Sequence, residues 1–152
     1  PQNPFKEKKN LLPEYDRLHL VNLAIEDNDK LRAKDFEFYL PKPSYTIDTL
    51  VYLEEKYPKH NFALIMGADN LPTLPKWKNG DVLMKNYKIY VYNRPGTTLD
   101  VSKYPGNIVI QETPQVYLSA SHIREQIKAE RSIKYIVPPA VEQYIRDSGW
   151  YK

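Results

Sequence analysis

The sequence predicts an α/β domain with a largely parallel sheet, because strand-like apolar runs alternate with helix-like segments along the chain. Residues 62–66 and 89–92 are apolar without alternation, which is typical of strands covered by helices on both faces of a sheet. The first run stops at Gly67, as a strand entering a loop would. The chain has 152 residues, the usual size of one domain, so we expect residues 1–152 to form a single domain.

Two helices are predicted in the first third of the chain, with an extended segment between them. Apolar residues recur at helical spacing after Pro13 and predict a helix over residues 13–26. The aromatic run 36–40 is followed by a proline, which predicts an edge strand or an extended loop. Thr46 is expected to cap a second helix that ends near Tyr57.

The rest of the chain contains shorter predicted elements. Residues 108–110 form a third apolar run and predict another strand. Gly149 is expected to end the last helix, because glycine readily adopts the left-handed backbone of a helix terminus. The predicted helices span residues 69–74, 81–85, 121–129 and 139–148.

Composition and charge exclude several classes of protein. The 22 Lys and Arg exceed the 19 Asp and Glu by too little for a nucleic-acid platform, although the net charge of +3 suits an anionic small molecule. No apolar run is long enough to span a membrane. The absence of cysteine excludes a disulfide framework and fits a cytoplasmic protein. The tyrosines and the tail Trp150-Tyr151-Lys152 are compatible with self-association into a homo-oligomer.

Gly67-Ala68-Asp69 directly follows a predicted buried strand, where open α/β sheets bind their ligands. Asp69 is suited to accept hydrogen bonds from ribose hydroxyls, and an alternative role for it is the N-cap of the next helix. Downstream, Trp77 lies between Lys76 and Lys78, which makes deep burial of the indole unfavourable.

Pro43-Ser44-Tyr45-Thr46 forms a turn into a helix, so backbone N–H groups and the Thr46 hydroxyl converge on one point. A carboxylate or phosphate would be stabilised there, whereas a plain helix cap is the alternative. Leu118-Ser119-Ala120-Ser121-His122-Ile123-Arg124 repeats this arrangement at a later helix start. Its arginine lies one turn into the helix and can offer a planar fork to phosphate oxygens, and a serine cap with a solvated arginine is the alternative.

These segments, with Asn3-Pro4-Phe5-Lys6 at the start of the chain, resemble the bacterial nicotinate-nucleotide adenylyltransferase family. The resemblance implies a Rossmann-like, doubly wound, mostly parallel sheet and adenylyl transfer from ATP to nicotinate mononucleotide in NAD biosynthesis, with Mg²⁺ arriving on ATP. It assigns the mononucleotide to Asn3, Lys6, Tyr45, Thr46, Asp69, Trp77 and Arg94. It assigns ATP to Gly67, Asp69, Ser119, Ser121 and Arg124. No nucleic acid and no membrane is implied as a partner.

The family's His-x-Gly-His motif is absent from the sequence, and we expect it on an N-terminal strand and helix upstream of Pro1. His19, His60 and His122 do not form that motif and have no metal-site spacing, so the catalytic residues stay unassigned and no protein metal site is predicted. Three alternatives remain at this point. One is a non-catalytic nucleotide-binding module, and another is a related transferase acting on pantetheine phosphate or a cytidyl substrate. The third is a protein-interaction domain.

Overall fold

The computed structural model describes residues 11–97, 103–104 and 107–151, and the chain divides into two compact units. The first unit runs from Tyr39 to Tyr117 and contains the sheet. In the second unit the described residues are 11–38 and 118–151, and the regular elements among them are helices. None of the helices in the described part of the chain has the length and apolar character needed to cross a bilayer.

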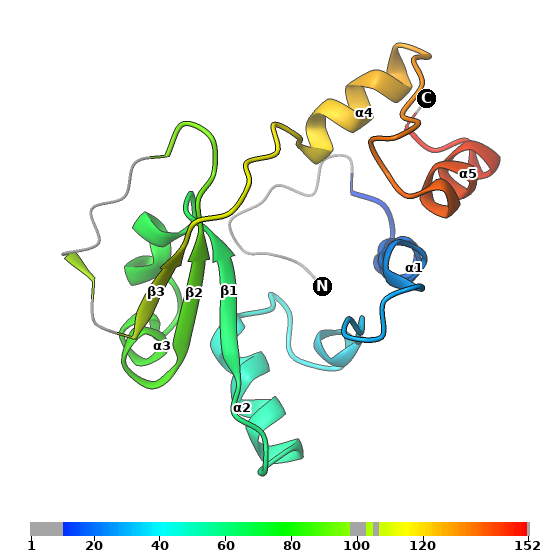
Figure 1. Cartoon of the computed structure of the whole chain (residues 1–152). Coiled ribbons are helices and arrows are strands. Elements are labelled where there is room, and N and C mark those ends of the chain that lie inside the picture. The colour runs from blue at the N-terminus through cyan, green and yellow to red at the C-terminus, as the bar shows by residue number, and fades with distance from the viewer. Residues whose placement is uncertain (1–10, 98–102, 105–106, 152) are drawn as a thin grey trace. The chain divides into compact units, whose positions relative to one another are not determined.

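The first unit is built on three parallel strands, β1 (Ala63–Gly67), β2 (Lys88–Tyr92) and β3 (Ile108–Gln111). They lie in the order β1-β2-β3, with all three arrowheads at one end of the sheet (Figure 1). Helices connect β1 to β2, as parallel pairing requires. The predicted α/β class with a parallel sheet is therefore confirmed.

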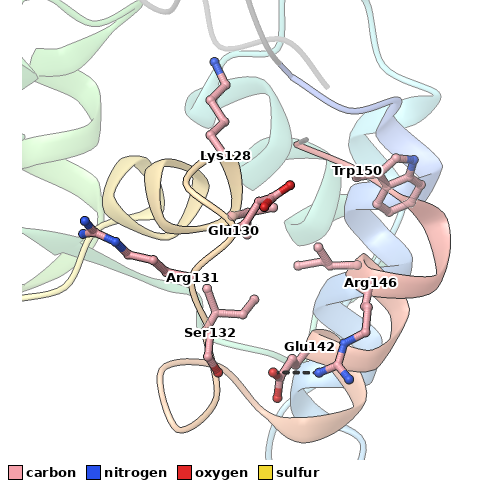
Figure 2. A pocket seen from close by; sticks show the side chains of 10 residues that line it. Lys128, Glu130, Arg131, Ser132, Glu142, Arg146 and Trp150 are labelled. Carbon is pink, nitrogen blue, oxygen red and sulfur yellow. Dashed lines mark hydrogen bonds and ion pairs between the residues drawn. The ribbon is translucent and has the colours of Figure 1, made fainter.

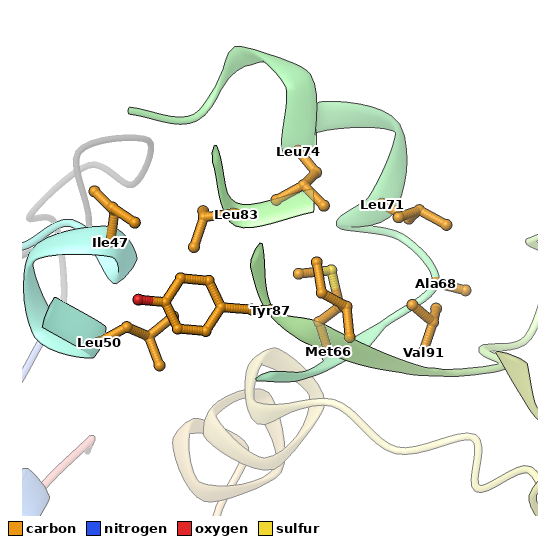
Figure 3. Packing of buried hydrophobic residues seen from close by; sticks show 10 residues of the cluster. Ile47, Leu50, Met66, Ala68, Leu71, Leu74, Leu83, Tyr87 and Val91 are labelled. Carbon is orange, nitrogen blue, oxygen red and sulfur yellow. The ribbon is translucent and has the colours of Figure 1, made fainter. Parts of the chain in front are cut away.

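One face of this sheet carries the core of the unit. Met66 and Val91 are register partners, and both are buried against helical residues of α2 (Thr46–Lys56), η2 (Leu71–Lys76) and α3 (Gly80–Asn86). Figure 3 shows these side chains converging around Tyr87. The buried cluster consists of Ile47, Leu50, Met66, Ala68, Leu71, Leu74, Leu83, Tyr87, Ile89 and Val91.

The prediction that β1 is buried on both faces was wrong. Ile65 points to the face opposite the core and is 71% exposed. Its register partner Tyr90 is half-buried. Within the described residues α2, η2 and α3 pack on the Met66 side, so successive side chains of β1 meet different surroundings.

The second unit packs α1 (Glu14–Ile25), α4 (Ala120–Lys128) and α5 (Pro139–Ser148) around a smaller apolar cluster. Its buried members are Ile133, Val141 and Ile145, with Leu20, Leu23, Ile123, Ile127, Val137 and Tyr151 packed against them. Gly149 ends α5 with a positive φ of 65°, as predicted. The helices expected over residues 13–26, 121–129 and 139–148 are thus confirmed to within a residue or two.

Two other expectations need correction. The run 36–40 forms a 3₁₀ turn, η1 (Phe36–Phe38), instead of a strand or an extended loop. The Phe38 ring packs edge-on against Tyr15 of α1 at a centroid distance of 5.0 Å, so its aromatic surface is covered by a helix and not by a sheet. The helix expected over residues 69–74 is η2, which begins two residues later and contains Pro75, whose missing N–H favours a short 3₁₀ helix over an α-helix.

Tyr87 is a core residue whose ionisation differs from that of a free tyrosine. Its hydroxyl donates a hydrogen bond to Glu54 Oε2 at 3.0 Å. Burial, and then the bond to and the negative charge of Glu54, raise the pKa of Tyr87 from 10.0 to about 12. The folded state therefore favours the neutral phenol, and this stabilisation is complete below pH 10 and is lost as the pH rises toward 12.

We expect Tyr87→Phe to lose about 1 kcal/mol of stability at pH 8, because the hydrogen bond to Glu54 is removed. The same variant should lose less additional stability than the wild type between pH 10 and 12. Urea unfolding across this range measures both effects. Tyr117→Phe is the control, since Tyr117 is 84% exposed and should follow the wild-type curve. Parallel curves for wild type and Tyr87→Phe would contradict the assignment.

Candidate functional site

The carboxyl ends of β1 and β2 bring Gly67, Asp69 and Arg94 together. The Ala68 amide donates to the Tyr92 carbonyl at 2.9 Å, which holds the two strand ends side by side. A Cβ on Gly67 would lie 2.5 Å from Asp69 Oδ1 and 2.8 Å from Arg94 Cδ, so both side chains lie directly over the glycine. Arg94 Nη1 is 3.8 Å from Asp69 Oδ1. Asp69 and Arg94 therefore form a polar pair at the carboxyl ends of the strands, which is where such folds bind ligands.

The Asp69 and Arg94 side chains are both partly exposed. An ion pair of this length and exposure adds little to stability. Asp69 is not the N-cap of η2, because that position belongs to Asn70. Asp69 therefore keeps carboxylate oxygens available for hydroxyl groups of a ligand, and the alternative of a capping role is removed.

The start of α2 collects polar groups around Tyr45 and Thr46. Tyr45 is extended and takes the cap position, so Thr46 is the first helical residue and not the N-cap that was predicted. No side chain caps α2, which leaves its first backbone N–H groups without that partner. Lys78 Nζ binds both carboxylate oxygens of Asp48 at 2.8 and 2.9 Å and lies 4.8 Å from the centre of the Tyr45 ring.

Trp77 directly precedes Lys78 and is the C-cap of η2. Its amide donates a hydrogen bond to the Leu74 carbonyl at 3.0 Å. The indole Nε1 donates to Thr73 Oγ1 at 3.2 Å. Its ring is half-buried and packs against the main core, in agreement with the expectation that it is not deeply buried. A fixed, partly exposed indole is suited to stack on a planar ring.

Two groups at this end of the unit were not assigned a role from the sequence. The Ser44 hydroxyl oxygen is buried and has no hydrogen-bond partner among the described residues. Lys78 reaches across 30 residues to Asp48, a pairing that no local pattern indicates. The sequence did contain one signal for Ser44, which is its position inside the Pro43-Ser44-Tyr45-Thr46 turn. A serine hydroxyl in a turn commonly forms a hydrogen bond with the backbone that follows it.

The start of α4 in the second unit presents the other predicted set. Ser119 is the N-cap, and its side chain accepts a hydrogen bond from the His122 amide at 3.1 Å. Arg124 Nη2 donates to Ser121 Oγ at 3.1 Å, which places the guanidinium over the first turn of the helix. The structure thus brings Ser121 and Arg124 together where a helix N-terminus favours negative charge.

Ser121 and Arg124 line a cavity of about 540 Å³ within the second unit. Tyr151 forms part of its wall, with a positive φ of 65°. Burial raises the pKa of the Tyr151 phenol, while the positive charges of Arg124 and Arg17 act in the opposite direction. The other lining residues are Leu11, Leu12, Glu125 and Lys128.

The predicted site residues therefore fall into two groups, each described within its own unit. The first unit holds Tyr45, Thr46, Gly67, Asp69, Trp77 and Arg94. The second unit holds Ser119, Ser121 and Arg124. Asn3 and Lys6 lie outside the described residues.

The side chains of His19 and His60 make ring contacts, and the backbone amide of His122 donates a hydrogen bond to Ser119 Oγ. His19 packs edge-on against Tyr144 at 4.5 Å, and His60 contacts the rings of Tyr57 and Phe62. Within the described ranges no three His, Cys, Asp or Glu side chains are placed to hold a metal ion.

The sequence matches the Cytidylyltransferase-like family over residues 1–126. A probable nicotinate-nucleotide adenylyltransferase from Cytophaga hutchinsonii is 45% identical over 151 residues, covering 99% of this chain and 79% of that protein. A probable nicotinate-nucleotide adenylyltransferase from Flavobacterium psychrophilum is 47% identical over 154 residues, covering 100% of this chain and 80% of its own length.

The fold is also similar to that of solved enzymes. The structure of Plasmodium falciparum nicotinic acid mononucleotide adenylyltransferase complexed with APC matches with a TM-score of 0.77 and 21% identity, covering 93% of this chain and 77% of that one. The same enzyme complexed with NaAD matches with a TM-score of 0.75 and 20% identity, covering 96% and 78%. At this level of identity the likeness shows a shared fold.

Proposed function

The chain belongs to the nicotinate-nucleotide adenylyltransferase family, and on that premise we propose that it transfers the adenylyl group of ATP to nicotinate mononucleotide in NAD biosynthesis. The mononucleotide phosphate oxygen forms a bond to the α-phosphorus of ATP. The bond from that phosphorus to the bridging oxygen of the β-phosphate breaks, and pyrophosphate leaves. The products are nicotinate adenine dinucleotide and pyrophosphate.

The observation that carries this proposal is the presence of two polar sites of different chemistry in one family member. The first unit offers a partly exposed indole and an uncapped helix start, which suit an aromatic ring bearing a carboxylate. The second unit offers Ser121 and Arg124 at the start of α4, which suit phosphates. We take both units as parts of one nucleotidyltransferase domain.

In the first unit, the described geometry supports the following proposed substrate contacts. Trp77 stacks on the pyridine ring, and the N–H groups beside Tyr45 and Thr46 receive the nicotinate carboxylate. Nicotinamide has no negative charge to place there, so the acid is preferred. Asp69, supported by Arg94 over Gly67, accepts hydrogen bonds from ribose hydroxyls.

In the second unit, Ser119 keeps the α4 terminus ordered, while Ser121 and Arg124 hold ATP phosphates. We propose Mg²⁺ as the cation bound to those phosphates, which it neutralises when bound. The charge that develops on the departing pyrophosphate is stabilised at this helix start, so positioning and charge neutralisation supply the catalysis. The reaction is proposed to take place in the cytoplasm.

The proposal is tested by measuring dinucleotide formation from ATP and Mg²⁺ with nicotinate or nicotinamide mononucleotide in parallel. We expect faster turnover with the nicotinate form. Trp77→Ala should raise KM for nicotinate mononucleotide by up to about tenfold, the effect of one lost aromatic stacking contact, and leave KM for ATP unchanged.

Trp77→Phe is the matched control for this experiment, because it keeps an aromatic ring and should recover most of the affinity for the mononucleotide. A rise in KM for ATP with no change for the mononucleotide would reverse the two assignments. Absence of dinucleotide with either mononucleotide would reject the proposed reaction.

A further inference from the structure

The α4 helix carries a third polar residue on the face that presents Ser121 and Arg124. Arg124 follows Ser121 by three residues and Lys128 follows Arg124 by four, so all three side chains lie on one side of the helix. All three line the same cavity of about 540 Å³. At a rise of about 1.5 Å per residue, they extend over roughly 10 Å of helix.

The charge around this cavity favours an anion. Arg124 and Lys128 are cations, and Glu125 is the one carboxylate among the residues that line it. The Arg124 guanidinium is held toward the helix start by Ser121, whereas Lys128 has no hydrogen-bond or ion-pair partner in the part of the chain that the structure describes. A cation without a partner is available to a ligand.

Lys128 also borders a second cavity of about 460 Å³ between the ends of α4 and α5. Figure 2 shows the Lys128 ammonium group pointing away from the Glu142–Arg146 ion pair that closes the far side of this second cavity. Arg131 and Arg146 also line this second cavity, but Glu130 and Glu142 balance their charges, and Arg146 is already paired with Glu142 at 2.9 Å. The cavity shared with Arg124 includes Ser121 at the start of α4, where backbone N–H groups favour an anion, so it is the better destination for the charge of Lys128.

We propose that Lys128 binds the pyrophosphate end of the nucleotide. Lys128 would extend the phosphate site formed by Ser121 and Arg124, so that this site holds two linked phosphates instead of one. This inference rests on the proposed function, because the reaction releases pyrophosphate. Ser121 and Arg124 take the inner phosphate, and Lys128, one turn further along, takes the outer one. The competing explanation is that Lys128 only stabilises the C-terminal turn of α4.

Titration calorimetry with inorganic pyrophosphate and with inorganic phosphate separates these explanations. We expect Lys128→Gln to weaken pyrophosphate binding about five- to tenfold, the size of one charge-assisted hydrogen bond at a partly exposed site, and to change phosphate binding less than twofold. Arg124→Ala should weaken both ligands. Glu125→Gln should tighten pyrophosphate, because a like charge is removed from the cavity.

Lys134→Gln is the matched control, since Lys134 lies on the following loop with its ammonium group over the Tyr135 ring. It should leave both affinities unchanged. Equal loss of phosphate and pyrophosphate affinity in Lys128→Gln, or no loss of either, would overturn the inference. So would failure of the wild-type enzyme to bind pyrophosphate.

The reverse reaction distinguishes this inference from the proposed function. Nicotinate adenine dinucleotide and pyrophosphate should give ATP and nicotinate mononucleotide, with KM for pyrophosphate raised in Lys128→Gln and kcat retained. Pyrophosphate binding that depends on Lys128 in an enzyme that forms no dinucleotide would support the phosphate site and reject the reaction. Dinucleotide formation with pyrophosphate affinity independent of Lys128 would do the opposite.

Discussion

Arg124→Ala will lower kcat/KM for ATP by roughly 10- to 150-fold, the range expected when charge-assisted hydrogen bonds worth about 1.5–3 kcal/mol are lost. The guanidinium is held over the first turn of α4 by Ser121, where it can form two parallel bonds to phosphate oxygens. Steady-state kinetics with ATP varied at saturating mononucleotide measures the effect. KM for nicotinate mononucleotide should change little.

Two further arginine variants make this experiment specific. Arg124→Lys keeps the charge but not the planar fork, so it should recover only part of the activity. Arg146→Ala removes an arginine of the same unit that is paired with Glu142 at 2.9 Å, and it should retain the wild-type kcat/KM. Equal losses in Arg124→Ala and Arg146→Ala would indicate a general effect on the second unit instead of a phosphate contact.

Gly80→Ala will destabilise the first unit and displace Trp77. A Cβ on Gly80 would collide with the Leu74 carbonyl oxygen, which is the group that accepts the Trp77 amide. The obstacle is backbone, so no side-chain rotation can relieve it. We expect a loss of about 2–3 kcal/mol, as for other overpacked sites, and a fall in Tm of roughly 5–12 °C.

Mononucleotide binding distinguishes a displacement of Trp77 in Gly80→Ala from a general loss of stability. At a temperature where Gly80→Ala is folded, KM for nicotinate mononucleotide should rise while KM for ATP stays near the wild-type value. Gly96→Ala is the control, because a Cβ there meets no atom within 4 Å and only its φ of 77° is unfavourable. Its expected loss is about 1–2 kcal/mol, with both KM values unchanged. A Gly80→Ala enzyme with wild-type Tm would refute the packing argument.

The elements that the sequence predicts well are those with strong local signals. The helix over 139–148 ends at Gly149 as predicted, because the residue that permits a left-handed terminus is itself in the sequence. The strands at 62–66 and 89–92 were also found, since each is a short apolar run bounded by turn residues. The order of motifs along the chain was sufficient to predict the family.

Predictions failed where a neighbouring element decided the outcome. The run 36–40 has strand-like composition, yet Phe38 is covered by Tyr15 of α1 and forms a 3₁₀ turn. Ile65 belongs to an apolar run, yet α2, η2 and α3 all pack on the other face of β1. Propensity describes a residue and its neighbours in the sequence, whereas burial depends on what packs against it in space.

The same division applies to the candidate sites. The sequence placed Arg124 one turn into the helix that starts near Ser121, and the structure brings the two side chains into hydrogen-bond contact, as residues three apart on a helix can make. Only the tertiary structure joined Lys78 to Asp48 and Asp69 to Arg94, since these pairs are 30 and 25 residues apart and no local rule links them. Only the tertiary structure turned the α4 face into a cavity, because Leu11 and Tyr151 come from opposite ends of the chain to form its walls.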